Sequence, residues 1–289
     1  MIRRALRART AQVAVAFLGL VLVLVVTGDL FAPQDPLAQD TSAILQGSSA
    51  AHWLGTDYLG RDVLSRLIAG TRVSVFAALT AVVIGALLGI VPGMLSAFSG
   101  KVATWTSLRV ADAFMALPFI IFAIAVAGLF GNGLFQAMVA VGVLIAPVYF
   151  RIIRAAALSH AGAQYVEAAT LLGAPWWHVL AVHIWPKVLP AVVVTTANLA
   201  AGGLLVVSSL TFLGIGIQPP EPTWGGMLAS DLGYLTQRPF GPVAPALAIM
   251  GTVAALNLLA DAIRDASGDA GRAAEALRNP LKREVADVR

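Results

Sequence analysis

Long stretches without a charged side chain limit what this sequence can fold into. They cover residues 11–28, 73–100, 113–150, 188–220 and 239–260. About 20 consecutive apolar residues in a helix cross the hydrocarbon core of a bilayer, so each stretch can supply at least one crossing. Charged residues make up 12% of the chain, whereas about 25% is typical of soluble domains. The chain is therefore predicted to be an all-α integral membrane protein.

Two of these stretches need a further decision about how many times they cross. Residues 113–150 would form a helix of about 57 Å, nearly twice the thickness of a hydrocarbon core. Gly131, Asn132 and Gly133 interrupt this stretch and favour a tight turn between two spans. Residues 188–220 read as one span that ends at Gly214 and the Pro219-Pro220 pair. The sequence thus predicts six transmembrane helices.

The distribution of Lys and Arg predicts the orientation. With the N-terminus inside, fifteen of the 19 basic residues fall in cytoplasmic segments, as the positive-inside rule requires. Both termini are then cytoplasmic. The net charge of +4 is explained by this bias and gives no reason to expect nucleic-acid binding.

The order of segments follows from the spans. We expect a cytoplasmic N-terminus (1–10), a first helix that is not cleaved as a signal peptide (11–31), an exported loop (32–72), a five-helix core (73–265) and a cytoplasmic tail (266–289). The connection at residues 101–112 is expected to be a short cytoplasmic loop. Within the exported loop, residues 61–69 predict an amphipathic helix at the membrane surface, serving as an anchor or contacting an external partner. The absence of cysteine excludes disulfides and thiolate metal sites.

The long cytoplasmic loop at residues 158–187 carries an unusual apolar pattern. Residues 165–172 favour a helix that stops at Gly173, Pro175 suits the first turn of a second short helix, and Pro186 is expected to end it. Apolar side chains in this loop face no lipid. Such a patch on a water-facing loop indicates an interface with another protein. The patch comprises Leu171, Leu172, Trp176, Trp177 and Val179.

The spacing Glu-Ala-Ala, three residues, Gly, nine residues and His-Ile-x-Pro resembles the coupling loop of permease subunits in bacterial ATP-binding-cassette importers. The resemblance implies a type I (MetI-like) permease architecture in the plasma membrane. It also implies partners: a homologous permease forming a heterodimer, two cytoplasmic ATPase subunits and an external solute-binding protein. The implied ATPase-coupling residues are Glu167, Ala168, Ala169, Gly173, Trp176, His183, Ile184 and Pro186.

Three further segments, at residues 55–72, 210–228 and 257–265, are similar to the dipeptide, oligopeptide and nickel branch of that family. Short peptides are therefore the expected substrates, with nickel or another small solute as the alternative. Ser208 and Ser209 replace an acidic residue common in relatives, and the usual Asp-Pro-Arg is missing from the tail. The resemblance implies that the binding protein contacts the last exported loop, and the candidate contacts are Trp224, Asp231 and Arg238.

Other chemistries fit the sequence poorly. No phosphate-binding loop occurs, because Gly100-Lys101 is followed by Val102, so ATP and Mg²⁺ are expected on a separate subunit and no cofactor or catalytic residue is assigned here. His178 and His183 are five residues apart, which does not aim both at one metal. A proton-coupled carrier needs ionisable groups within its spans, and only Asp112 and Asp261 come near. The candidate polar lining of a translocation path is Asn198, Ser208, Ser209, Thr211 and Asn257.

Overall fold

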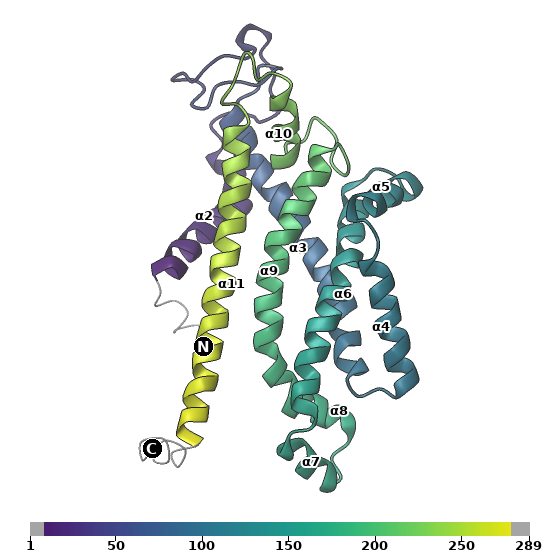
Figure 1. Cartoon of the computed structure of the whole chain (residues 1–289). Coiled ribbons are helices and arrows are strands. Elements are labelled where there is room, and N and C mark those ends of the chain that lie inside the picture. Colours follow the sequence, from purple (N-terminus) through teal and green to yellow (C-terminus); the bar gives the residue numbers. More distant parts are fainter. Residues whose placement is uncertain (1–8, 279–289) are drawn as a thin grey trace, which may run out of the picture.

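The computed structural model describes residues 9–278, which form long helices capped at one end by irregular chain (Figure 1). The opposite end carries the two short helices of the cytoplasmic loop. The helices are α2 (Arg9–Phe31), α3 (Val63–Ser96), α4 (Lys101–Met115), α5 (Phe119–Phe130), α6 (Leu134–Ala161), α7 (Gln164–Leu171), α8 (Trp176–His178), α9 (Trp185–Phe212), α10 (Trp224–Leu232) and α11 (Val243–Arg278), with a 3₁₀ turn η1 (Thr41–Ala43) and a π-helical turn η2 (Val179–Ile184).

Within residues 9–278, five helical stretches are long and apolar enough to cross a membrane, and a bent pair of helices, α4 and α5, taken as one span brings the number to six. The two helices of that pair meet at 89°. The bend follows from Pro118, which disfavours helical backbone at Leu117 and caps α5 with an extended conformation. Residues 101–112 were expected to form a short cytoplasmic loop, but the structure shows that they are helical and belong to α4.

Close packing of α3 on α6 forms the centre of the molecule. Gly85, Gly89 and Gly93 recur every four residues along α3 and face α6. A Cβ added at any of the three would lie closer than 3.0 Å to Ile145, Ala146 or Phe150. Small residues at this spacing allow two membrane helices to approach backbone to backbone. Four helices, α3, α5, α6 and α9, contribute to the neighbouring buried cluster, which includes Ala81, Ala123, Val141 and Leu210.

The predicted surface helix at residues 61–69 is wrong. Asp62 caps the N-terminus of α3 by accepting a hydrogen bond from the Ser65 amide at 2.8 Å, and α3 then runs without a break into the membrane span. The polar face that was expected to meet water is buried, with Arg61 2% and Arg66 6% exposed. Buried charges need partners, and the exported chain that folds over Arg61 and Arg66 supplies these partners.

We call residues 32–62 the exported cap. Asp57 in the cap pairs with Arg61 through Nε and Oδ2 at 2.7 Å and with Arg66 at 3.4 Å. Arg66 also donates to the Pro36 carbonyl at 3.0 Å. Arg238, between α10 and α11, donates to the Leu54 carbonyl at 2.8 Å. These bonds attach the cap both to α3 and to the last exported loop.

The last helix continues well past its apolar stretch. The span ends near Ala266, and α11 extends to Arg278, so the described part of the expected cytoplasmic tail is helical. Most of the predicted N-terminal segment and the last part of the predicted tail lie outside the described residues.

Candidate docking loop and translocation path

The cytoplasmic loop turns sharply at Gly173, as predicted. This residue has φ +83°, a left-handed conformation that glycine adopts without steric cost. The amides of Leu172 and Ala174 bond back to the Ala168 and Ala169 carbonyls, both at 3.0 Å, and close the end of α7. Glycine therefore reverses the chain directly after α7.

The chain after the turn differs from the prediction at Pro186. Instead of ending a helix, Pro186 lies in the first turn of α9, and helical backbone runs from Trp176 to Phe212. Pro186 has no amide to donate, and the π-helical turn before it accommodates this, because the Trp185 amide bonds to the Leu180 carbonyl five residues back. The docking loop is thus continuous with a membrane span.

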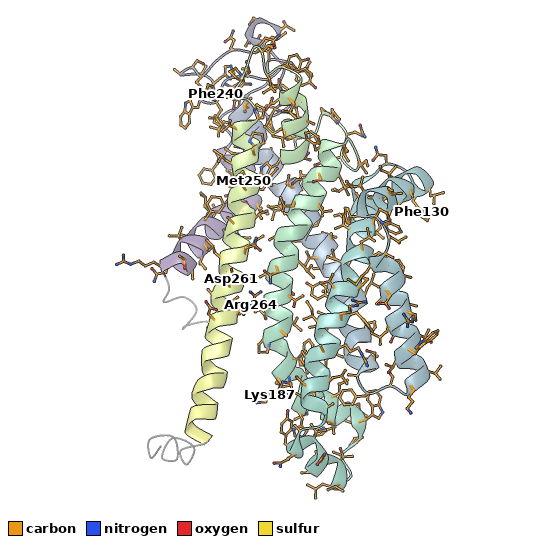
Figure 2. All side chains as sticks on the ribbon, viewed as in Figure 1. Phe130, Lys187, Phe240, Met250, Asp261 and Arg264 are labelled. Carbon is orange, nitrogen blue, oxygen red and sulfur yellow. The ribbon has the colours of Figure 1, made fainter. Side chains whose placement is uncertain are left out.

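One side of the loop is buried. Val166, Val179 and Ile184 pack against Ile153 and Ala157 of α6 in a single apolar cluster. Ile184 and Ala157 are 0% exposed. This cluster fixes the loop to the cytoplasmic ends of the spans, at the end where Lys187 lies (Figure 2).

The other side of the loop is exposed and apolar. Leu171 is 88%, Leu172 89%, Trp176 63% and Trp177 59% exposed. We call these four residues the docking face. Large apolar side chains in this arrangement mark a protein interface.

The structure separates the eight predicted coupling residues into two groups. Glu167, Ala168, Gly173, Trp176 and Pro186 are exposed. Ala169 and Ile184 pack inward instead, and His183 is half-buried with its ring 6.1 Å from that of His178 and 6.3 Å from that of Tyr165. Ile184 therefore supports the loop from within and is not available for direct contact.

The five predicted path residues do not converge. Ser208 is buried and its Oγ has no hydrogen-bond partner among the described residues, whereas Ser209 is exposed and donates to the Leu205 carbonyl at 2.8 Å. Thr211 is buried and bonds within its own helix. Asn257 is exposed on α11. A translocation path through all five thus stays a prediction.

Two of the predicted path residues line cavities: Thr211 borders one beside the loop that follows α9, and Asn198 borders another. A space of about 290 Å³ between α6, α9 and α11 is bordered by Asn198, Thr195 and Arg264. Arg264 pairs with Asp261 at 3.0 Å on the same helix (Figure 2). Sequence reasoning did not place Arg264 on the path, although it is the one charged residue of this cavity.

The predicted contacts for an external binding protein need correction. Trp224 is 2% exposed, and its Nε1 donates to the Leu67 carbonyl at 3.2 Å. Asp231 is also buried, and Arg238 holds the exported cap. These side chains anchor α10 and the last exported loop to the rest of the chain, so the surface above them is formed by others, such as Phe240, which is 81% exposed (Figure 2).

The carboxyl group of Asp231 is buried in a place that disfavours its negative charge. Burial raises the pKa of this carboxyl to about 6, and nearby Arg238 offsets only part of that rise. Its Oδ2 has no hydrogen-bond partner among the described residues. Desolvation therefore disfavours the charged form at this position.

Six spans, a cytoplasmic loop with an exposed apolar face and a capped exported end define a polytopic α-helical membrane protein. Residues 81–269 match the family described as binding-protein-dependent transport system inner membrane component. The chain belongs to that family of importer permease subunits and is a multi-pass protein of the bacterial inner membrane.

Two similar permease proteins agree with this family. A glutathione transport system permease protein of Pectobacterium atrosepticum is 36% identical over 265 residues, covering 91% of this chain and 88% of that protein. A di/tripeptide transport system permease protein of Pseudomonas aeruginosa is 37% identical over 257 residues, covering 86% and 85%.

The fold matches a solved importer. The inward-facing MetNI methionine ABC transporter superposes with a TM-score of 0.59 over 69% of this chain and 95% of that one. At 18% identity this similarity supports the type I permease fold alone.

Proposed function

We propose that this chain imports short peptides, di- and tripeptides including glutathione, as one of two permease subunits driven by separate ATPases. The main structural observation that supports this proposal is the docking face. It is exposed on one side and supported by a buried cluster on the other, so force applied to it moves the ends of α6 and α9. Relatives named for di/tripeptide and glutathione transport support the substrate class.

Coupling follows from the continuity of the backbone. α7 adjoins α6, and α8 runs through η2 directly into α9. Closure of the ATPase pair would therefore rock both spans together as rigid levers. The remaining partners in this proposal are a second, homologous permease and an external solute-binding protein that delivers peptide over the exported end.

Uptake by a deletion strain tests the substrate class. Cells lacking this gene are supplied with a labelled dipeptide, a labelled tripeptide, labelled glutathione or nickel, with and without the gene restored. We expect restored uptake of the peptides and no effect on nickel. Restoration of nickel uptake alone would show that the substrate is the metal.

Membrane vesicles test the energy source. Vesicles containing the complete complex and its binding protein should accumulate peptide with ATP at the ATPase side and no proton gradient. Accumulation driven by a proton gradient without ATP would contradict ATP coupling.

A further inference from the structure

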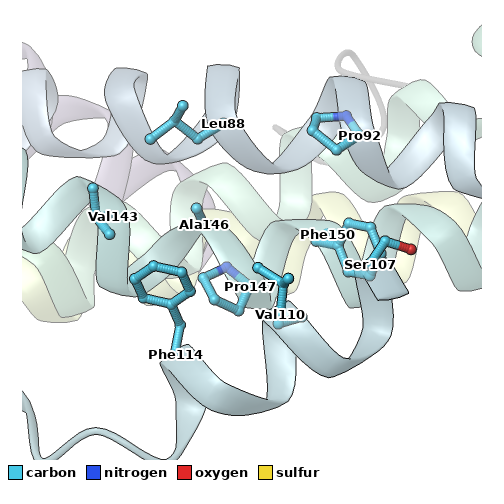
Figure 3. Close-up of a pocket in the computed structure, with 10 residues that line it drawn as sticks. Leu88, Pro92, Ser107, Val110, Phe114, Val143, Ala146, Pro147 and Phe150 are labelled. Carbon is cyan, nitrogen blue, oxygen red and sulfur yellow. The ribbon is translucent and has the colours of Figure 1, made fainter. Parts of the chain in front are cut away.

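Two of the cavities in this chain differ in the chemistry of their walls. The larger, of about 410 Å³ between α3, α4 and α6, is lined by apolar side chains such as Leu88, Phe114 and Phe150 (Figure 3). The one hydroxyl side chain on its walls, Ser107, already donates to the Thr104 carbonyl at 3.0 Å. A charged ligand would therefore find no partner there.

The second cavity, which we call the exported pocket, has a volume of about 320 Å³ and lies at the exported end. Its walls come from the exported cap, the first turn of α3, the end of α9, the loop after α9, and α10. Pockets for small ligands usually have about 300–1,000 Å³ and a few polar groups on mainly apolar walls. The charged side chains on the walls of the exported pocket are Arg61, Arg66 and Glu221.

The two arginines of the exported pocket are buried and share one counter-charge. The side chain of Arg61 is 3% exposed and that of Arg66 is 7% exposed. Asp57 Oδ2 faces the Nε atoms of both, at 2.7 and 3.4 Å. Asp62 and Asp231 are also buried, but neither forms an ion pair with either arginine within the part of the chain that the structure describes. Asp57 alone therefore pairs with both guanidinium groups.

Several donors of these arginines have no acceptor. Arg66 donates from one terminal nitrogen to the Pro36 and Pro220 carbonyls, at 3.0 and 3.4 Å. Among residues 9–278, the other terminal nitrogen of Arg66 and both terminal nitrogens of Arg61 form no hydrogen bond. The Arg61 guanidinium lies 5.4 Å from the centre of the Tyr58 ring instead. Buried polar groups normally have partners, so these donors indicate an acceptor inside the exported pocket.

The chemistry of the walls favours a ligand with both charges. The terminal nitrogens of a guanidinium form a planar fork that fits the two oxygens of a carboxylate. Glu221, on the same walls, is exposed, so its carboxylate is open to an ammonium group. A lone inorganic anion would satisfy the arginines but would place a like charge near Glu221. A short peptide carries a carboxylate and an ammonium group and satisfies both.

We propose that the exported pocket is an entry subsite in which Arg61 and Arg66 bind the C-terminal carboxylate of a short peptide and Glu221 binds its N-terminal ammonium group. This inference rests on the proposed function, because the ligand is the peptide to be imported. The bound peptide contacts the cap, α3 and the α9–α10 loop at once. The subsite thus holds the peptide at the exported end before it enters the membrane.

Saturation-transfer NMR, which detects weak ligands, tests the subsite on the complete transporter complex in nanodiscs. The external binding protein is left out because it binds peptide itself. The probes are dialanine, dialanine amide and acetate. We expect a signal from dialanine, competition by acetate, and a signal about fivefold weaker from the amide, which lacks the carboxylate.

Three variants locate the signal. Arg61→Lys keeps the charge beside Asp57 but lacks the fork, and it should weaken both dialanine and acetate binding about fivefold. Glu221→Gln should weaken dialanine and leave acetate unchanged. Ile217→Trp fills the pocket without altering a charge and should abolish both signals. Arg109→Lys, at an exposed position on α4, is the matched control and should behave like the wild type. Thermal unfolding of each complex checks that the variants fold.

Four results would overturn the subsite. Equal signals from dialanine and its amide would remove the carboxylate contact, and no signal from dialanine would show that water satisfies the arginines. An acetate signal unchanged in Arg61→Lys would indicate an adventitious ion only. Weaker docking of the peptide-free binding protein on the Arg61→Lys complex, with dialanine binding unchanged, would assign the pocket to a carboxylate of that partner.

Uptake by the deletion strain separates this inference from the proposed function. Restored dipeptide uptake without carboxylate-dependent binding would overturn the subsite and leave peptide import standing. Carboxylate-dependent binding without restored uptake would instead overturn the proposed import and leave the site.

Discussion

Arg66 on α3 and Asp57 in the exported cap form an ion pair in which both side chains are buried, with Nε and Oδ2 3.4 Å apart. Asp57 serves Arg61 as well, at 2.7 Å. Arg66 also donates to the Pro220 carbonyl at 3.4 Å, in the loop that follows α9. One carboxylate thus neutralises two buried arginines where the cap, α3 and the α9–α10 loop meet.

The first prediction concerns that carboxylate. Asp57→Asn leaves two buried guanidinium groups without their counter-charge, and we expect a loss of about 3 kcal/mol in the free energy of unfolding. Thermal unfolding of the purified complex and limited proteolysis of the exported cap measure it. Asp35→Asn, at an exposed position in the same cap, should change stability little. Equal effects of the two substitutions would contradict the role of Asp57.

The second prediction concerns the contact between α3 and α6. Gly89→Ala places a methyl group against the backbone of Ala146, so the two helices must move apart, at an expected cost of about 1–3 kcal/mol. Thermal stability of the complex in nanodiscs measures the change. Gly19→Ala on α2 meets no atom within 4 Å and should be neutral or slightly stabilising. A neutral Gly89→Ala would show that the helices pack less closely than described.

The third prediction separates backbone strain from bulk in the docking loop. Gly173→Val meets no neighbouring atom, but valine strongly disfavours φ +83°. We expect distortion of the turn, weaker association with the ATPase subunits and reduced uptake.

Gly162→Val is the matched control for Gly173→Val. It also meets no atom within 4 Å, but its φ is −92°. Co-purification of the ATPase subunits should be preserved in this control. If both valine variants retained the ATPase equally, the left-handed turn would not be needed for docking.

The fourth prediction concerns the docking face. Trp176→Ala removes an exposed aromatic side chain, so the stability of this chain should not change, while affinity for the ATPase subunits should fall about tenfold or more. Val179→Ala, in the buried cluster beneath, should instead lower thermal stability. A Trp176→Ala complex with unaltered ATPase affinity would remove this residue from the interface.

The fifth prediction is a pH dependence from Asp231. Its pKa, about 6 in the folded protein, lies above the ordinary value of 3.8. The folded state therefore binds the proton more tightly, and the associated stability is full below pH 4 and is lost as the pH rises through 6. Asp231→Asn should stabilise the exported cap at pH 7 but have little effect at pH 4. Hydrogen exchange of α10 and the cap at both pH values measures this, and a gain equal at both would contradict it.

The number of spans and the turn in the cytoplasmic loop could be predicted because their signals are local. Apolar stretches of span length and the Gly173 turn each depend on residues adjacent in the chain, and a bilayer imposes one simple requirement on all of them. Pro118 is also a local signal for the bend. Counting spans by the length of apolar stretches does not use this signal, so the bend was not predicted.

The roles of individual polar residues could not be predicted in this way. Arg61 and Arg66 have the spacing of a surface helix, yet they are buried, because Asp57 and distant carbonyl groups compensate their charges. Trp224 was assigned to an exposed loop, and its indole is held by Leu67, 157 residues away.

The sequence by itself determined that this chain crosses a membrane, which way it faces and where a cytoplasmic loop exposes large apolar side chains, since each depends on local composition and on the solvent around it. The tertiary structure decided which charges are buried, how closely α3 approaches α6 and where a cavity remains beside α4. These depend on atoms that only folding brings together, so neither hydropathy nor motif spacing could show them.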